Sequence, residues 1–120
     1  MYVLFVIGRI LFGGYFIYNA LGHFMKLGAL SGYAASKKIP MPKAAVIISG
    51  VALLLGGLSI VINFSVLIGL WILVAFMVIV TLTMHQFWRE QDGMHRMNET
   101  IQFSKNVAII GALLILISFA

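Results

Sequence analysis

The chain has 120 residues, of which 62% are hydrophobic and only 9% are charged, and its formal net charge is +5. A soluble domain usually carries about 25% charged residues, so this composition excludes a soluble globular protein. The chain has no cysteine, which excludes disulfides, Fe–S clusters and thiolate-bound haem within it.

The apolar residues fall into four runs, and each run is long enough to cross a membrane. Backbone N–H and C=O groups find no water in the hydrocarbon, so each run must form an α-helix. The sequence therefore predicts an all-α polytopic membrane protein, a single domain over residues 1–120 that forms a bundle of four transmembrane helices in the lipid bilayer. The expected spans are residues 2–24, 44–62, 66–87 and 103–120.

The connection between the first two spans, residues 25–43, is long and amphipathic. Leu27, Leu30 and Tyr33 repeat at helical spacing, whereas Lys37 lies off their face. This pattern predicts a short helix that lies in the membrane interface. A surface loop with accidental spacing is the alternative.

The positive charges predict how the chain is oriented. With four spans, both long connections, residues 25–43 and 89–102, lie on one side, and both termini lie with the turn at 63–65 on the other. All Lys and Arg residues except Arg9 lie at the long connections or at their rim. The positive-inside rule therefore predicts cytoplasmic long connections and external termini. Such a juxtamembrane pattern favours anionic lipid, so no nucleic-acid partner is expected.

Polar residues inside a span are expensive in lipid and usually face the bundle interior. Arg9, Asn19 and His23 lie on one stripe of the first span, at about 100° per residue. Thr81, His85 and Trp88 share a face along the third span. Gln102 and Asn106 share a face near the start of the fourth span, on the same side of the membrane. These faces predict a polar cluster just beneath the cytoplasmic interface. The candidate ligand-binding residues are His23, His85, Trp88, Lys105 and Asn106, with no residue assigned as a catalytic group or a metal ligand.

Three interpretations of this polar cluster are open. It can hold a quinone headgroup, because His and Asn hydrogen-bond to carbonyl oxygens and histidine can pass protons near neutral pH. It can hold haem b between His23 and His85, although their position at span ends disfavours this. In the third interpretation each histidine binds a carbonyl or a lipid headgroup, and the aromatic residues only anchor the interface.

Arg9 and the small residues raise separate hypotheses. Arg9 can snorkel to the near surface, bind backbone carbonyls, hold an anionic ligand or pair with an acid of a partner chain. Small residues four apart, as at Ala52 and Gly56 and near Gly111, predict close helix packing.

Six short segments carry a resemblance that covers nearly the whole chain. They are GRILFG at 8–13, GHF at 22–24, YAA at 33–35 leading into IPMP at 39–42, LGGLS at 55–59, MHQFW at 84–88 and FSKNVA at 103–108. In this order and spacing they resemble the DoxX family of small bacterial membrane proteins. The resemblance implies a four-helix bundle in the bacterial cytoplasmic (inner) membrane. The matching positions with polar or aromatic side chains are Arg9, His23, His85, Trp88, Lys105 and Asn106.

The family resemblance implies less about activity. The family name derives from a subunit resembling a thiosulfate:quinone oxidoreductase component, and another member is linked to a membrane oxidoreductase complex in oxidative-stress defence. We therefore expect an accessory subunit of a quinone-linked redox assembly, and whether the chain is itself an enzyme stays open. The alternative is a structural or scaffold protein that acts through homo-oligomerisation or a partner. A small transporter is less favoured, because the sequence shows no broken helix or buried acid.

Overall fold

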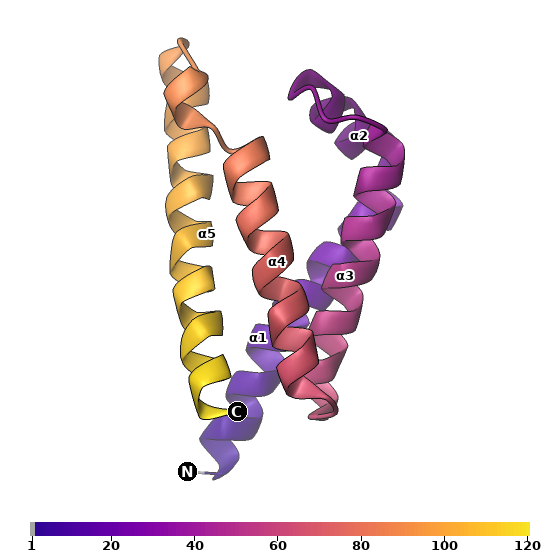
Figure 1. Ribbon diagram of the computed structural model, residues 1–120, viewed down its shortest axis with the longest axis vertical. Coiled ribbons are helices and arrows are strands. Elements are labelled where there is room, and N and C mark those ends of the chain that lie inside the picture. The colour runs from indigo at the N-terminus through magenta and orange to yellow at the C-terminus, as the bar shows by residue number, and fades with distance from the viewer. Residues whose placement is uncertain (1) are drawn as a thin grey trace.

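The computed structural model describes residues 2–120, and the regular elements in that range are helices (Figure 1). Four of them are long and apolar enough to cross a membrane. The chain therefore has the all-α, four-span membrane fold expected from its sequence. The elements are α1 (Tyr2–Met25), α2 (Leu27–Ser36), α3 (Pro42–Ile62), α4 (Val66–Met84), the 3-10 helix η1 (Phe87–Arg89) and α5 (Gly93–Phe119).

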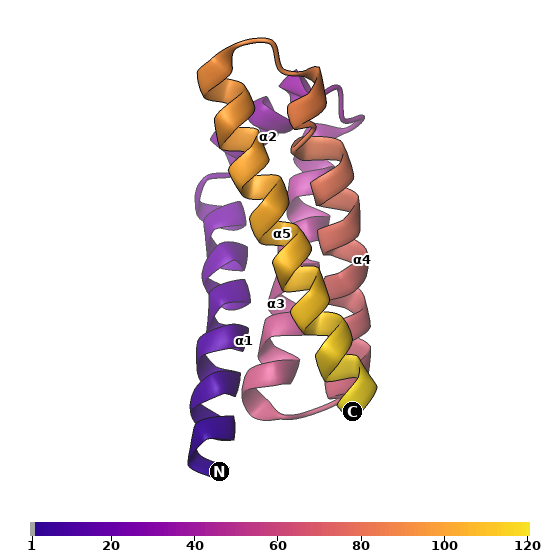
Figure 2. The same cartoon turned by 90° about the vertical axis from the view of Figure 1, so that its left-hand side faces the viewer.

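The two long connections lie at one end of the bundle, and both ends of the chain lie at the other (Figures 1 and 2). The short helix α2 fills most of the first connection, as its amphipathic pattern predicts. Pro42 begins α3, where a missing N–H costs nothing. The predicted tight turn after α3 is present, with Asn63 and Ser65 in the left-handed region at φ 58° and 49°.

The largest difference from the expected spans is at the start of α5, which begins at Gly93 and not at residue 103. Asp92 caps the helix, because its side chain accepts a hydrogen bond from the backbone N–H of His95 at 3.0 Å. The polar residues before 103 therefore lie on a helix and not in a loop. This extension carries Glu99, which is only 7% exposed, so the expectation that the chain has no buried acid is wrong.

A second difference is at the end of α4, where the helix stops at Met84 and not at residue 87. The side chain of Gln86 donates to the carbonyl of Leu82 at 2.8 Å, a carbonyl that a continuing helix would bond to the backbone N–H of Gln86. The chain then bends at His85 into η1. Trp88 therefore leaves the helical face that it was expected to share with His85.

Two glycines let the backbones of α1 and α3 come close where these helices cross. A Cβ atom on Gly13 would lie 2.8 Å from the carbonyl oxygen of Gly57, and a Cβ on Gly57 would lie 2.8 Å from that of Gly13. Gly56, expected from its spacing to be a packing residue, faces the side chain of Leu73 on α4. Gly111 has open space around it, so it takes no part in packing within residues 2–120.

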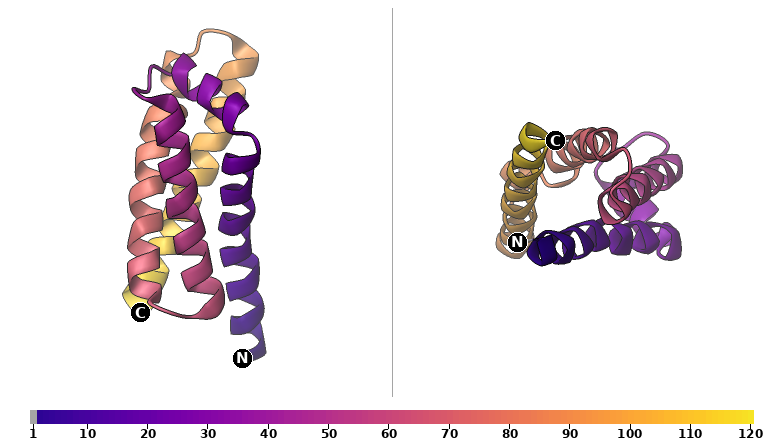
Figure 3. Two further views of the ribbon diagram at one scale, coloured as in Figure 1. Left: turned by 90° about the vertical axis from the view of Figure 1, so that its right-hand side faces the viewer. Right: turned by 90° about the horizontal axis from the view of Figure 1, so that it is seen from below.

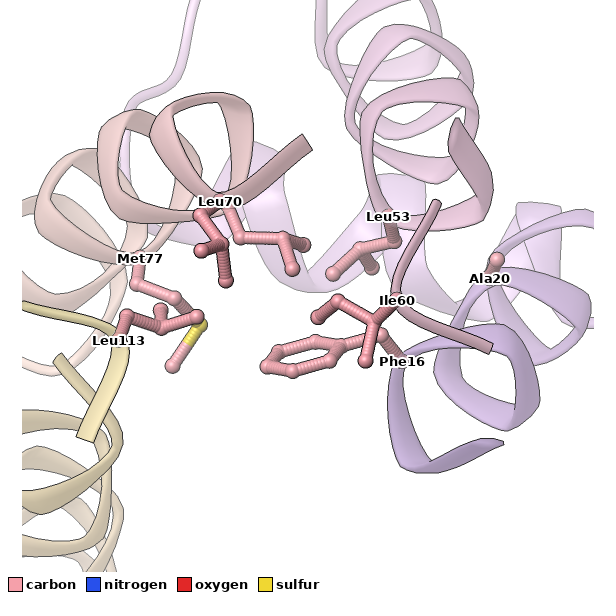
Figure 4. Packing of buried hydrophobic residues seen from close by; sticks show 8 residues of the cluster. Phe16, Ala20, Leu53, Ile60, Leu70, Met77 and Leu113 are labelled. Atoms are coloured by element: carbon pink, nitrogen blue, oxygen red, sulfur yellow. The ribbon is translucent and has the colours of Figure 1, made fainter. Parts of the chain in front are cut away.

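The four long helices surround a common centre, and neighbours pack in the order α1 against α3, α3 against α4, and α4 against α5 (Figure 3). Within residues 2–120, α1 and α5 share no comparable backbone packing. A cluster of buried side chains from all four long helices fills part of the centre (Figure 4). Phe16, Leu73 and Leu113 are fully buried in this cluster. A cavity lies among the helices next to this core, toward the long connections.

Candidate ligand cavity

The cavity has a volume of about 600 Å³ and lies in the half of the bundle nearest the long connections. Five helices, α1 to α5, and the Ile39–Pro40 segment contribute to its wall, and most of the lining is apolar. Its volume falls in the range of about 300–1,000 Å³ that is typical of small-molecule sites. The residues with polar side chains in the wall are Tyr15, Asn19, His23, Tyr33, Ser49, Thr83, His85, Gln102, Lys105 and Asn106.

The structure brings most of the candidate residues to this one cavity. His23 comes from α1, His85 from the end of α4, and Lys105 and Asn106 from α5. Trp88 is absent from the wall and is 46% exposed. It instead packs edge-on against Phe87 and Phe103, at centroid distances of 5.3 and 5.8 Å, because the chain leaves the helix before it.

Both cavity histidines use the same ring nitrogen within the protein. The Nδ1 atom of His23 lies 2.9 Å from the carbonyl oxygen of Asn19, one turn earlier on α1. The Nδ1 atom of His85 lies 3.1 Å from Oε1 of Glu99. In each ring this leaves Nε2 for another partner.

Asn106 is the most deeply buried polar residue of the cavity wall, with 5% exposure. Asn19, His85 and Lys105 form side-chain hydrogen bonds, whereas the Asn106 amide forms none within residues 2–120. Lys105 is exposed, and its Nζ atom donates to Gln102 at 2.8 Å and lies 5.9 Å from the centroid of the Tyr15 ring. The cavity wall therefore holds a largely buried asparagine whose amide has no hydrogen-bond partner within residues 2–120.

Next to the cavity is a group of charged and polar residues. Apart from His85, none of them was a candidate site residue in the sequence. Glu99 accepts hydrogen bonds from the Tyr33 hydroxyl at 2.8 Å and from Lys37 Nζ at 2.6 Å, and it also binds His85. Lys37 donates in addition to Glu90 at 2.9 Å. We call Glu99, Tyr33, Lys37, His85 and Glu90 the Glu99 cluster. It links α2, which covers one end of the cavity, to α5.

The contacts within the Glu99 cluster shift the pKa values of Tyr33 and Lys37, which lie outside the spans. Burial, together with the hydrogen bond to Glu99, raises the pKa of Tyr33 to about 12. Burial acts to lower the pKa of Lys37, but the hydrogen bonds to Glu99 and Glu90 outweigh it and raise the pKa above its ordinary value. Lys37 is therefore charged and Tyr33 neutral at physiological pH, and the cluster loses its tyrosine proton only as the pH rises toward 12.

The Glu99 cluster had one detectable signal in the sequence. Glu99, Gln102 and Asn106 are spaced by three and four residues, so they follow one face if the helix begins before Glu99. The Asp92 cap with helix-forming residues after it marks such an early start. The partners of Glu99 on α2 are far away in sequence and follow no local pattern.

Arg9 lies outside the cavity wall. Its guanidinium carbon lies 5.1 Å from the centroid of the Phe5 ring, a cation–π contact within α1. Its Nε atom is buried and has no hydrogen-bond partner within residues 2–120. The hypotheses of a surface-directed side chain, an anionic ligand or a partner's acid stay predictions.

The fold and the cavity define a class, a small multi-pass membrane protein with a ligand-sized cavity among its helices. The model of the DoxX family matches residues 4–86, and the chain belongs to this family. The match contains Arg9, His23 and His85 and ends before Trp88 and the start of α5. No curated protein and no solved structure matches the chain.

Proposed function

We propose that this chain is an accessory subunit of a quinone-linked redox assembly, and that its cavity binds the ring headgroup of a quinone or a related lipid. The observation that carries the proposal is the unpartnered amide of Asn106 in the cavity wall. Asn106 is 5% exposed and lines the cavity, and its amide forms no hydrogen bond within residues 2–120, so both its N–H groups and its oxygen are free for a ligand. An oxygen atom of a bound ring can supply the missing hydrogen bond.

The rest of the cavity suits the same class of ligand. Side chains such as Phe16, Leu53 and Phe76 provide an apolar wall for a ring and the start of a tail. Polar groups from His23 and His85 lie in the same wall, where each can hydrogen-bond to a ring substituent. The combination of many apolar contacts and a few polar groups is typical of sites that orient a lipid-like molecule.

An accessory role follows from what the chain itself offers. The family takes its name from a subunit that resembles a thiosulfate:quinone oxidoreductase component. This chain has no cysteine for thiol-based steps. Such steps therefore belong to a partner, while this chain holds the lipid-soluble reactant in the bacterial inner membrane. The proposal includes the orientation in which the Glu99 cluster lies at the cytoplasmic face and both termini lie outside.

Binding of a short-chain ubiquinone, tested both oxidised and reduced to the quinol, checks this function in lipid nanodiscs. We expect Asn106→Leu to weaken binding of the better-bound form about fivefold, because one hydrogen bond is worth roughly 1 kcal/mol. Asn98→Leu is the matched control, since Asn98 lies on the same helix but is exposed and outside the cavity wall. Equal affinity of the two variants, or no binding to the unchanged protein, would contradict the proposal.

The second candidate is a structural or scaffold protein that acts through self-association or a partner. The open space around Gly111, with Ala108 and Ala112 on the same helix, favours it because small residues let another helix approach α5. This role predicts an oligomer or a captured partner in nanodiscs and no dependence of lipid binding on Asn106.

A further inference from the structure

Building on the proposed function, we propose that the cavity selects a ring that donates hydrogen bonds, so that a hydroxylated ring lipid such as a quinol binds better than its oxidised, carbonyl-bearing form. The donors and acceptors of the cavity wall determine this preference, above all the partners of His23 and His85 and the hydroxyl groups around them.

The Glu99 cluster sets the tautomer of His85. Lys37 Nζ lies 2.6 Å from Oε2 of Glu99, which keeps this carboxylate ionised. An ionised carboxylate only accepts hydrogen bonds, so the Nδ1 atom of His85, 3.1 Å from Oε1, must carry the hydrogen. In a neutral imidazole the other nitrogen is then an acceptor, which leaves the lone pair of Nε2 for the cavity.

His23 has the same tautomer for an independent reason. Its Nδ1 atom lies 2.9 Å from the carbonyl oxygen of Asn19, and a carbonyl can only accept. The hydrogen is again on Nδ1, and Nε2 is again an acceptor. His23 on α1 and His85, directly after α4, therefore each leave one acceptor nitrogen unused within the protein, and both residues line the same cavity.

Three hydroxyl groups of the wall are already used as donors. Ser49 donates to the carbonyl of Val46 at 3.0 Å, Thr83 to that of Ile79 at 2.7 Å, and Tyr33 to Glu99 at 2.8 Å. The Asn19 amide uses one of its two N–H groups on the carbonyl of Tyr15. The donors that remain belong to Asn106, which can donate or accept, and to the less buried Asn19, Tyr15, Gln102 and Lys105.

A ring with hydroxyl groups satisfies this arrangement better than one with carbonyls. Each hydroxyl can donate to a histidine nitrogen, and its oxygen can still accept from Asn106. A carbonyl ring offers only lone pairs, so the two Nε2 atoms stay unpaired, and a buried unpaired group is costly. The hydrogen-bond chemistry of the wall thus distinguishes two forms of one ring that have nearly the same shape.

A redox-inert pair of ligands tests the inference, a 5-alkylresorcinol and its dimethyl ether, which has the same ring and tail but no hydroxyl hydrogen. Binding of both is measured in nanodiscs at about pH 8, above the ordinary titration range of imidazole. We expect the diol to bind at least about tenfold more tightly, equivalent to one or two hydrogen bonds. His23→Phe and His85→Phe should each reduce this preference severalfold.

His95→Phe is the control, because His95 is exposed and lies outside the cavity wall. It should keep the preference of the unchanged protein. Equal or tighter binding of the dimethyl ether overturns the donor preference but leaves the proposed function standing. If neither ligand nor a short-chain ubiquinone binds, the proposed function itself fails. A preference that survives in both His23→Phe and His85→Phe also overturns the inference.

Discussion

Replacement of Glu99 by alanine is expected to lower the free energy of unfolding by about 3 kcal/mol, the scale seen when one partner of a buried ion pair is removed. Glu99 is 7% exposed and binds Tyr33, Lys37 and His85 at once. Its loss leaves the Lys37 ammonium with Glu90 as its remaining carboxylate partner and removes the link between α2 and α5. Equilibrium unfolding in mixed detergent and SDS micelles, followed by tryptophan fluorescence, measures the change.

Glu90→Ala is the matched control for the Glu99 variant. Glu90 binds Lys37 at 2.9 Å but is the more exposed of the two carboxylates, with 26% of its side chain accessible against 9% for Glu99. More exposed ion pairs contribute little, so we expect a loss of about 1 kcal/mol or less. Equal losses in the two variants would show that the Glu99 cluster does not depend on its buried carboxylate.

Gly57→Ala is expected to destabilise the protein by about 2 kcal/mol, within the usual cost of overpacking a tight contact. The added Cβ would lie 2.8 Å from the backbone carbonyl oxygen of Gly13, which cannot move aside as a flexible side chain can. Helices α1 and α3 would then have to move apart at this contact. The same unfolding measurement in mixed micelles reports the loss.

Gly14→Ala provides the control for the glycine contact. Gly14 is next to Gly13 on α1, but a Cβ there meets no atom within 4 Å. Alanine favours helix over glycine by up to about 1 kcal/mol, so this variant should be unchanged or slightly more stable. A similar loss in Gly14→Ala and Gly57→Ala would mean that helix contact at Gly57 is not the cause.

The number of apolar helices could be predicted from the sequence. Long apolar runs must become helices in lipid, so four spans follow from residues that lie next to one another in the chain. The glycine spacing in α3 likewise predicted close packing at Gly56. Hydropathy marks where a helix is apolar and not where it ends, which is why the sequence predicts a connection where the polar start of α5 lies.

The candidate site could be predicted only in part, and for a related reason. Residues at the same depth on different spans, such as His23 and Asn106, converge once the topology is known. The predicted place of Trp88 in the site is wrong, because it assumed that the helix continues unbroken beyond Met84. Glu99 and Lys37 meet across a long sequence distance through side chains, and helical periodicity carries no information about such a pair.

The position of α2 connects the fold to the proposed function. Leu30, Tyr33 and Ala34 of this short helix line the cavity, and Tyr33 and Lys37 also bind Glu99 on α5. The group that orients His85 therefore also holds α2 over one end of the cavity. A ligand bound there would contact His85 and Tyr33, whose side chains are held in place by hydrogen bonds to Glu99.

A ring-headed lipid held in the cavity by Asn106 should co-purify with the protein. Mass spectrometry of the small molecules that co-purify in native nanodiscs tests this most directly, for the unchanged protein and for Asn106→Leu. We expect a quinone or quinol near one per chain in the unchanged protein and its strong depletion in the variant. Phospholipid alone in both samples, or the same amount of ring lipid in both, would contradict it.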